Sequence, residues 1–292
     1  MATLAMTRPV ELIPGRPQTL WGWPAVLNFA LGGLGAGLYV VAVAAAGFGR
    51  SPAVTVASWL GPALVLAGFA AVAMEAGRPF RGPRVLTRVR TSWMSRELWI
   101  GGVFVLLVAA DLAFPFRLHR IQAMGAALAL ALAQGFIVRR ARGIAAWDVS
   151  IMPLVFLLSA LLSGSGLYVS IEVVAGRLPG APLVAIVMAL LGAGLAAWAR
   201  YLRSSSELAF IQAVEPLGQG WAPLLIVGGG YVAPFALAAL AVALPPLAMP
   251  ALLMAGVLMI AAQLYAKARL ILTAGHLRPI TLAGLRIPRR LS

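Results

Sequence analysis

Residues 151–175 read IMPLVFLLSALLSGSGLYVSIEVVA, and Glu172 is the one charged side chain in this run. A helix of about 20 apolar residues is long enough to cross the hydrocarbon core of a membrane. The run is too long for a buried strand, and it lacks the alternation of polar and apolar side chains that is typical of membrane β-strands. The sequence therefore predicts a transmembrane helix here.

Apolar runs of the same kind recur along the whole chain of 292 residues, which is 62% hydrophobic and 11% charged, with a mean hydropathy of +0.95. An ordinary soluble domain is about half apolar and roughly a quarter charged. This composition excludes a typical soluble enzyme, a disordered chain and a secreted disulfide-bonded scaffold. We predict an all-α, polytopic membrane protein that forms a single membrane domain over residues 1–292. Its eight helices are expected over residues 24–47, 53–76, 96–116, 121–138, 151–175, 182–200, 221–244 and 248–271.

Each half of the predicted chain has four spans, with a long connection after its second span. The segment Ser95-Arg96-Glu97-Leu98 has a short echo in Ser205-Ser206-Glu207-Leu208. We therefore expect the spans to form two four-helix bundles. Whether the two halves are a true internal repeat stays open, because the echo is only four residues long.

The charged residues predict the orientation in the membrane. The net charge is +15, from 23 Lys plus Arg and 8 Asp plus Glu. Of the basic residues, 19 fall at the termini and in the even-numbered connections, and 4 fall in the odd-numbered connections. Basic residues gather on the cytoplasmic side of membrane proteins, so we expect both termini in the cytoplasm. The arginines lie in short clusters between apolar runs, and we therefore expect no nucleic-acid partner.

Cysteine and histidine limit the cofactors that this chain can hold. The sequence has no cysteine, which removes disulfides, thiolate catalysis and cysteine-ligated iron–sulfur clusters. His119 and His276 are the two histidines, and the predicted spans place them on opposite sides of the membrane. They cannot ligate one haem iron together. We expect no haem, no Fe–S cluster and no metal site in this chain.

Charged groups at membrane depth are functional candidates because their burial is costly. Glu75 and Glu97 lie near the predicted cytoplasmic boundary, where they either form interfacial salt bridges or accept protons from a substrate. Asp111 and Glu172 lie toward the other boundary. They could begin a proton path, but charges at the level of the interface are the simpler interpretation. Polar residues inside spans usually make interhelical hydrogen bonds, and here they are Asn28, Gln134, Tyr168, Tyr231 and Gln263.

Two motifs between the second and third spans carry a family resemblance. Gly77-Arg78-Pro79-Phe80-Arg81 follows Glu75, and Ser92-Trp93-Met94-Ser95-Arg96-Glu97 opens the next span. They resemble the Gly-x-Pro-x-Arg turn and the Ser-x-x-Ser-x-Glu segment of the membrane anchor subunits of molybdopterin oxidoreductases, of the dimethyl sulfoxide reductase and NrfD/polysulfide reductase type. The family often has His just before the turn, where this chain has Glu75.

The resemblance implies a quinone-reactive subunit without a redox metal of its own. Glu97 would accept the proton of a quinol, and Glu75 could relay it. The quinone, either ubiquinone or menaquinone, would bind without a covalent bond. The resemblance also implies an Fe–S electron-transfer subunit and a molybdenum or tungsten catalytic subunit as partners. The residues expected around the quinone are Asn28, Arg78, Trp93, Ser95 and Gln134.

The arginines of the connection over residues 77–95 place the docking face of these partners on the cytoplasmic side of a bacterial or archaeal cytoplasmic membrane. Two other functions remain alternatives to the quinone-reactive anchor. One is a proton or solute transporter, and the other is a purely structural anchor that binds no ligand.

Overall fold

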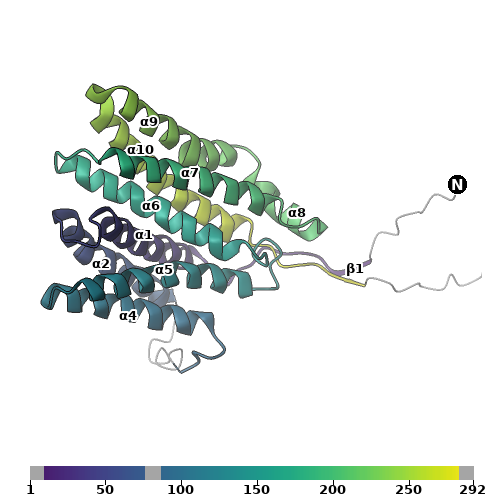
Figure 1. Cartoon of the computed structure of the whole chain (residues 1–292). Coiled ribbons are helices and arrows are strands. Elements are labelled where there is room, and N and C mark those ends of the chain that lie inside the picture. The colour runs from purple at the N-terminus through teal and green to yellow at the C-terminus, as the bar shows by residue number, and fades with distance from the viewer. Residues whose placement is uncertain (1–9, 76–86, 283–292) are drawn as a thin grey trace, which may run out of the picture.

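A computed structural model of the chain describes residues 10–75 and 87–282, and it is almost wholly helical (Figure 1). Seven helical segments of the described residues are long and apolar enough to cross a membrane. Helix α4 is similar in length but carries Arg96, Glu97 and Asp111. The long helices are α1 (Trp23–Ala45), α2 (Pro52–Glu75), α4 (Trp93–Ala113), α5 (Arg117–Arg140), α6 (Met152–Val174), α7 (Ala181–Leu202), a π-helix η3 (Leu224–Val232) continued by α9 (Ala233–Ala243), and α10 (Ala248–Ala268) continued by a π-helix η5 (Arg269–Thr273).

Each predicted apolar run corresponds to a helical segment, with ends that differ by a few residues. Helix α4 begins three residues earlier than expected because the hydroxyl of Ser92 accepts a hydrogen bond from the Ser95 N–H and caps the helix. The run over 221–244 is not one regular α-helix. Pro234 has no N–H for the Gly230 carbonyl, and its ring crowds that carbonyl, so the chain widens into the π-helix η3 just before it.

The long helices pack in two sets of four, α1, α2, α4 and α5 in one set and α6, α7, η3–α9 and α10 in the other (Figure 1). The two sets are joined because α6 packs against both α1 and α5. Gly37 of α1 and Gly164 of α6 lie back to back at this crossing, and a Cβ on either would overlap the backbone of the opposite helix. Small residues at such crossings let helices approach closely.

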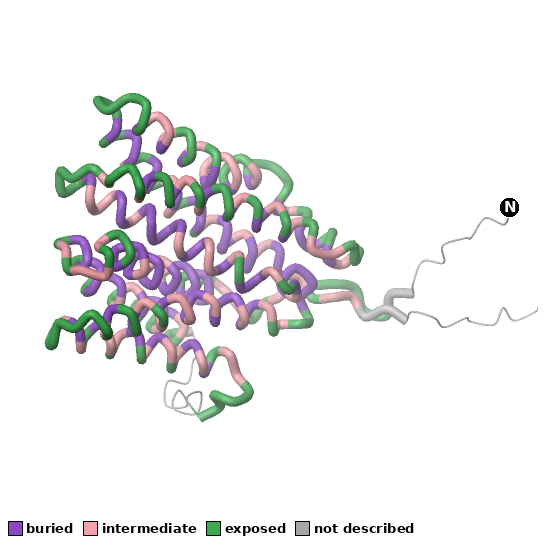
Figure 2. Tube along the Cα trace, in the orientation of Figure 1, coloured by how far each residue is buried: buried purple, intermediate pink, exposed green. Residues whose placement is uncertain are grey.

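Helix α1 lies at the centre of the molecule, with α2, α5, α6 and α10 packed around it. Most of its residues are buried, and they occupy more than one face of the helix (Figure 2). A polar side chain that points toward α1 is therefore shielded from the surroundings of the bundle.

One end of the bundle, which we call the strand end, carries both ends of the described chain. Strand β1 (Val10–Ile13) pairs antiparallel with β2 (Ile280–Leu282), so the two ends lie side by side (Figure 1). Arg278, two residues before β2, joins this segment to the bundle through ion pairs with Asp148 at 3.5 Å and Glu207 at 3.3 Å. The short helix α8 (Leu208–Val214) lies at the same end. The strands and α8 were not predicted.

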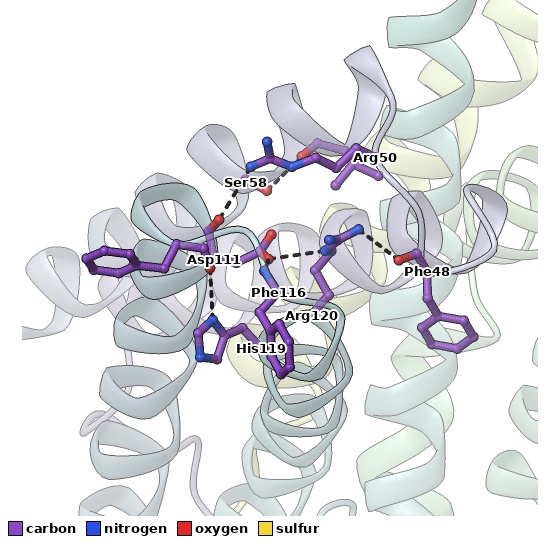
Figure 3. Close-up of polar contacts among 9 residues, drawn as sticks. Phe48, Arg50, Ser58, Asp111, Phe116, His119 and Arg120 are labelled. Atoms are coloured by element: carbon purple, nitrogen blue, oxygen red, sulfur yellow. Dashed lines mark hydrogen bonds and ion pairs between the residues drawn. The ribbon is translucent and has the colours of Figure 1, made fainter.

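The opposite end, which we call the hairpin end, carries the short connections around residues 46–51, 114–116, 175–180 and 244–247. Here a buried ion pair joins the Arg120 Nε atom to Asp111 Oδ1 at 3.1 Å (Figure 3). Arg120 also donates to the carbonyl of Phe48, and the Phe116 N–H donates to Asp111. Asp111 is therefore buried near the end of α4, where Arg120 folds inward and compensates its burial. Its location at the level of the interface stays a prediction.

Candidate functional site

Glu97 lies in the second turn of α4 and is only 4% exposed. Its Oε1 atom accepts hydrogen bonds from Asn28 Nδ2 of α1 at 3.0 Å and from Gln134 Nε2 of α5 at 3.1 Å. Gln134 Nε2 also donates to the backbone carbonyl of Asn28 at 3.3 Å. Three helices therefore meet at one carboxylate, and we call these residues the Glu97 cluster.

Both side chains that donate to Glu97 are neutral amides. The neighbouring Arg96 turns away, because its guanidinium donates to the carbonyls of Val89 and Arg90 and lies 4.5 Å from the ring centre of Trp93. The alternative of a salt bridge between Glu97 and an interfacial arginine is therefore wrong for Arg96. Among the described residues no arginine pairs with Glu97, and a carboxylate without such a partner can exchange a proton without breaking an ion pair.

Two glycines leave space beside the Glu97 cluster. A Cβ on Gly32 of α1 would overlap the Gln134 amide, so the absence of a side chain at Gly32 leaves the space that this amide occupies. A Cβ on Gly68 of α2 would stand 3.3 Å from Asn28 Oδ1. Among the described residues this buried oxygen has no hydrogen-bond partner. Asn28 thus donates to Glu97 with its nitrogen and keeps its oxygen for another donor.

An open cavity of about 510 Å³ lies at the strand end above the Glu97 cluster. Trp93 lines it and stands one turn before Glu97 on α4. Ile137 lines it and stands one turn after Gln134 on α5. At 1.5 Å per helical residue, the cluster lies roughly 6 Å deeper than the cavity wall. The ring of Trp93 stacks on Phe136 at 4.4 Å between ring centres. The cavity is lined by Trp21, Arg90, Thr91, Ser92, Trp93, Met94, Arg96, Ile137 and Arg140.

The structure brings together three of the predicted site residues, Glu97, Asn28 and Gln134. Trp93 lies apart from them at the cavity, and Ser95 is buried in the first turn of α4. The remaining two fall on parts of the chain that the structure leaves undescribed. Arg78 lies outside the described residues, and the same holds for the side chain of Glu75 at the end of α2.

Sequence reasoning missed Lys267, which was counted among the basic residues outside the spans. Lys267 is 4% exposed in the last turn of α10, and its Nζ atom donates to Ser159 Oγ of α6 at 2.8 Å. One signal could have revealed it: Lys267 is the single lysine of the chain and follows the buried Gln263 by four residues, on the same helix face.

These features define a polytopic helical protein whose buried carboxylate, held by two amides, lies one turn beneath a cavity lined by arginine and tryptophan. Within the described residues, no three His, Asp or Glu side chains are grouped as a metal site would require. The family model of the DMSO reductase anchor subunit (DmsC) matches residues 18–213, about two thirds of the chain and the whole Glu97 cluster. The chain belongs to this family, and it is a multi-pass membrane anchor subunit of a DMSO reductase-type complex. No curated protein matches it.

Proposed function

We propose that this anchor subunit binds quinone or quinol and exchanges electrons between the membrane quinone pool and an Fe–S subunit. That subunit would in turn serve a molybdenum or tungsten catalytic subunit. The observation that carries the proposal is the buried Glu97 carboxylate, held by two neutral amides beneath an open cavity. The family match favours an anchor over a transporter.

The donor and acceptor groups of the cluster suit a quinol, which supplies two electrons and two protons when it is oxidised. Asn28 Oδ1 is a buried acceptor that lacks a partner in the described chain, and it would accept a hydrogen bond from a ring hydroxyl. Glu97 would accept the proton of that ring, since it lies on the other arm of the same amide. Gln134 holds the carboxylate in place. Trp93 and Ser95 would shape the pocket on α4, with Arg78 and the proton relay Glu75 completing it from the segment before α4.

The strand end carries a cationic surface that would dock the partner subunits. Arg90, Arg96 and Arg140 line the open cavity, and Arg140 also lines an adjoining cavity of about 240 Å³ with Arg139 and Arg142. A basic surface steers and orients an acidic partner. An Fe–S subunit docked here would lie next to the cavity above Glu97, so that electrons would travel a short distance between the quinol and its cluster.

We further propose eight spans, with α4 as the eighth and with both termini in the cytoplasm of a bacterial or archaeal cell. The β1–β2 pairing supports an even number, because chain ends on the same side require an even number of crossings. The catalytic subunits would then face the cytoplasm.

The test is Glu97→Gln in the purified complex, whose subunits are first identified by mass spectrometry. Loss of a proton acceptor should lower quinol-linked turnover by roughly a hundredfold or more. The turnover of the catalytic subunit with a soluble redox dye, which bypasses the anchor, should stay unchanged. Glu172→Gln is the matched control, since Glu172 pairs with Arg177 at the hairpin end. Unchanged quinol turnover in Glu97→Gln would point instead to a structural anchor without a ligand.

A further inference from the structure

Lys267 is a buried amine that the proposed function does not yet use. It reaches from α10 toward α6, where Ser159 Oγ accepts its hydrogen bond at 2.8 Å. No carboxylate pairs with it in the part of the chain that the structure describes. A charged amine inside a membrane bundle is costly unless polar groups or water solvate it, so such a group is a functional candidate.

Lys267 opens onto a small cavity of about 10 Å³, which has room for about one water molecule. Four polar side chains, Lys267, Ser159, Tyr231 and Gln263, are among its lining residues, together with apolar ones such as Phe156 and Trp198. The buried Gln263 Nε2 atom has no hydrogen-bond partner within the described residues. A water molecule needs two to four polar partners, and these four side chains are the candidates for that role.

The unusual backbone beside this cavity supports a functional reading. Tyr231 is placed by the π-helix η3, and such segments often occur at functional sites. The cavity therefore combines a buried amine, a buried amide side chain and a local departure from regular helix in one place.

Gly33 of α1 connects Lys267 to the Glu97 cluster. A Cβ on Gly33 would stand 3.5 Å from Gln134 Oε1 and 3.5 Å from Lys267 Nζ, so these two atoms are at most twice that distance apart. Gln134 donates to Glu97 with the other atom of the same amide. A row of buried polar groups therefore crosses the bundle from Glu97 on α4 to Ser159 on α6, with a gap between Gln134 and Lys267 that no direct hydrogen bond among the described residues spans.

We propose that Lys267 is a second proton-holding residue of the quinol site, acting through Gln134 and exchanging its proton with water in the Tyr231–Gln263 cavity. The proposal rests on the proposed function. Oxidation of a quinol breaks two O–H bonds and releases two protons and two electrons. The electrons pass to the Fe–S partner, Glu97 takes one proton, and the Lys267 amine, in its neutral form, takes the other by way of a water molecule that the proposal places between Gln134 and Lys267. Reduction of a quinone reverses each transfer.

The titratable neighbours of Lys267 are few among the described residues of the packed helices. Tyr231 lines the same cavity, and Glu97 lies beyond Gln134. Tyr39 on α1 lies six residues beyond Gly33, and on α6 Tyr168 and Glu172 lie nine and thirteen residues beyond Ser159, toward the hairpin end. Arg269 turns away and donates to the Pro216 carbonyl at 2.7 Å. Lys267 and Glu97 are therefore the two groups of this row that we expect to exchange protons.

The experiment compares Lys267→Met and Lys267→Gln with the unaltered complex. Both replacements remove the proton-accepting group, and both side chains fit an apolar helix. We expect quinol turnover to fall by about a hundredfold at the optimum pH. The KM for quinol should stay unchanged, the pH profile should lose one of its two ionisations, and the dye-linked rate should remain normal. In Lys267→Ala, methylamine should restore turnover in proportion to the free base.

The outcomes separate this proposal from the proposed function. If Glu97→Gln abolishes quinol turnover while the Lys267 variants keep both the rate and the pH profile, Lys267 is structural and the proposal is wrong. If the variants lose turnover only in step with loss of assembled complex, and methylamine restores nothing, the proposal is equally overturned. If Glu97→Gln leaves quinol turnover unchanged, the proposed function itself is wrong.

Discussion

At the scale of residues, α4 carries two buried carboxylates with opposite surroundings. Asp111 forms a buried ion pair with the guanidinium of Arg120 at 3.1 Å. Glu97, fourteen residues earlier, accepts hydrogen bonds from two amide side chains, and no arginine among the described residues pairs with it. Two carboxyl groups of one helix are thus suited to different tasks, since environment decides whether a carboxylate stays ionised or exchanges its proton. Asp111 stabilises the hairpin end, whereas Glu97 exchanges a proton in the proposed function.

The position of Gln134 against Gly32 can be tested by a substitution that replaces no polar group. In Gly32→Ala, the added methyl group would occupy the position of the Gln134 amide, which is the far end of a flexible side chain. We expect the fold to survive with a loss of no more than about 1 kcal/mol, because the side chain can rotate away. Quinol turnover should fall at least about tenfold as Glu97 loses a donor.

The control for this variant is a glycine outside the site. In Gly102→Ala on α4, the added Cβ would meet no other packed group within 4 Å. Its turnover should stay near that of the unaltered protein. Thermal unfolding and quinol turnover of both variants decide the matter, and equal turnover in the two would show that the position of Gln134 is unimportant.

The sequence could identify Glu97, Asn28 and Gln134 as candidates because polar residues in apolar runs are visible in one dimension. It could not show that they share hydrogen bonds, since that depends on how α4 and α5 turn around α1. Lys267 was lost for the same reason. A lysine one turn from a helix end can extend to water or fold inward, and only the packing of α6 against α10 decides which.

At the scale of elements, the long helices could be predicted because an apolar run of about 20 residues has few alternatives. The short elements could not. Strands β1 and β2 are four and three residues long and pair across almost the whole chain, so neither has a local signal. Helix α8 has seven residues and lies within a connection. The π-helix η3 has the same apolar composition as a regular helix.

The hairpin end yields a prediction about stability. Arg120→Met leaves Asp111 buried without its cation, and it also removes the donor to the Phe48 carbonyl (Figure 3). Breaking a buried ion pair on one side costs roughly 3–5 kcal/mol. We expect a clear fall in the midpoint of thermal unfolding in detergent.

Adding Asp111→Asn to Arg120→Met removes the unpaired charge and should recover part of the lost stability. The control at the same end is Arg177→Met, whose side chain is 43% exposed in its pair with Glu172 and whose loss should cost at most about 1 kcal/mol. Equal midpoints for Arg120→Met and Arg177→Met would show that the buried pair contributes nothing.

At the scale of the whole molecule, charge, site and chain ends gather on one side. The cationic cavities, the Glu97 cluster and the β1–β2 pairing all lie toward the strand end. The bias of basic residues was visible in the sequence and predicts that this side is cytoplasmic. The cavities were not, because Trp21 precedes α1, Trp93 begins α4 and Arg140 ends α5, and these residues meet only in the folded bundle.

The cysteine-free sequence makes the orientation directly testable, because any introduced thiol is the single one in the chain. Arg88→Cys and Ser206→Cys place an exposed thiol at the strand end, and Pro115→Cys and Ala175→Cys place one at the hairpin end. We expect a membrane-impermeant maleimide to label the hairpin-end pair in intact cells and the strand-end pair only after permeabilisation. The 88 and 115 positions flank α4, so their opposite labelling would make α4 a true span despite its charges. Labelling of both strand-end thiols in intact cells would show that the orientation is the reverse of the predicted one. Identical labelling of positions 88 and 115 would show that α4 does not cross the membrane. The number of spans would then be odd, which conflicts with chain ends that pair on the same side.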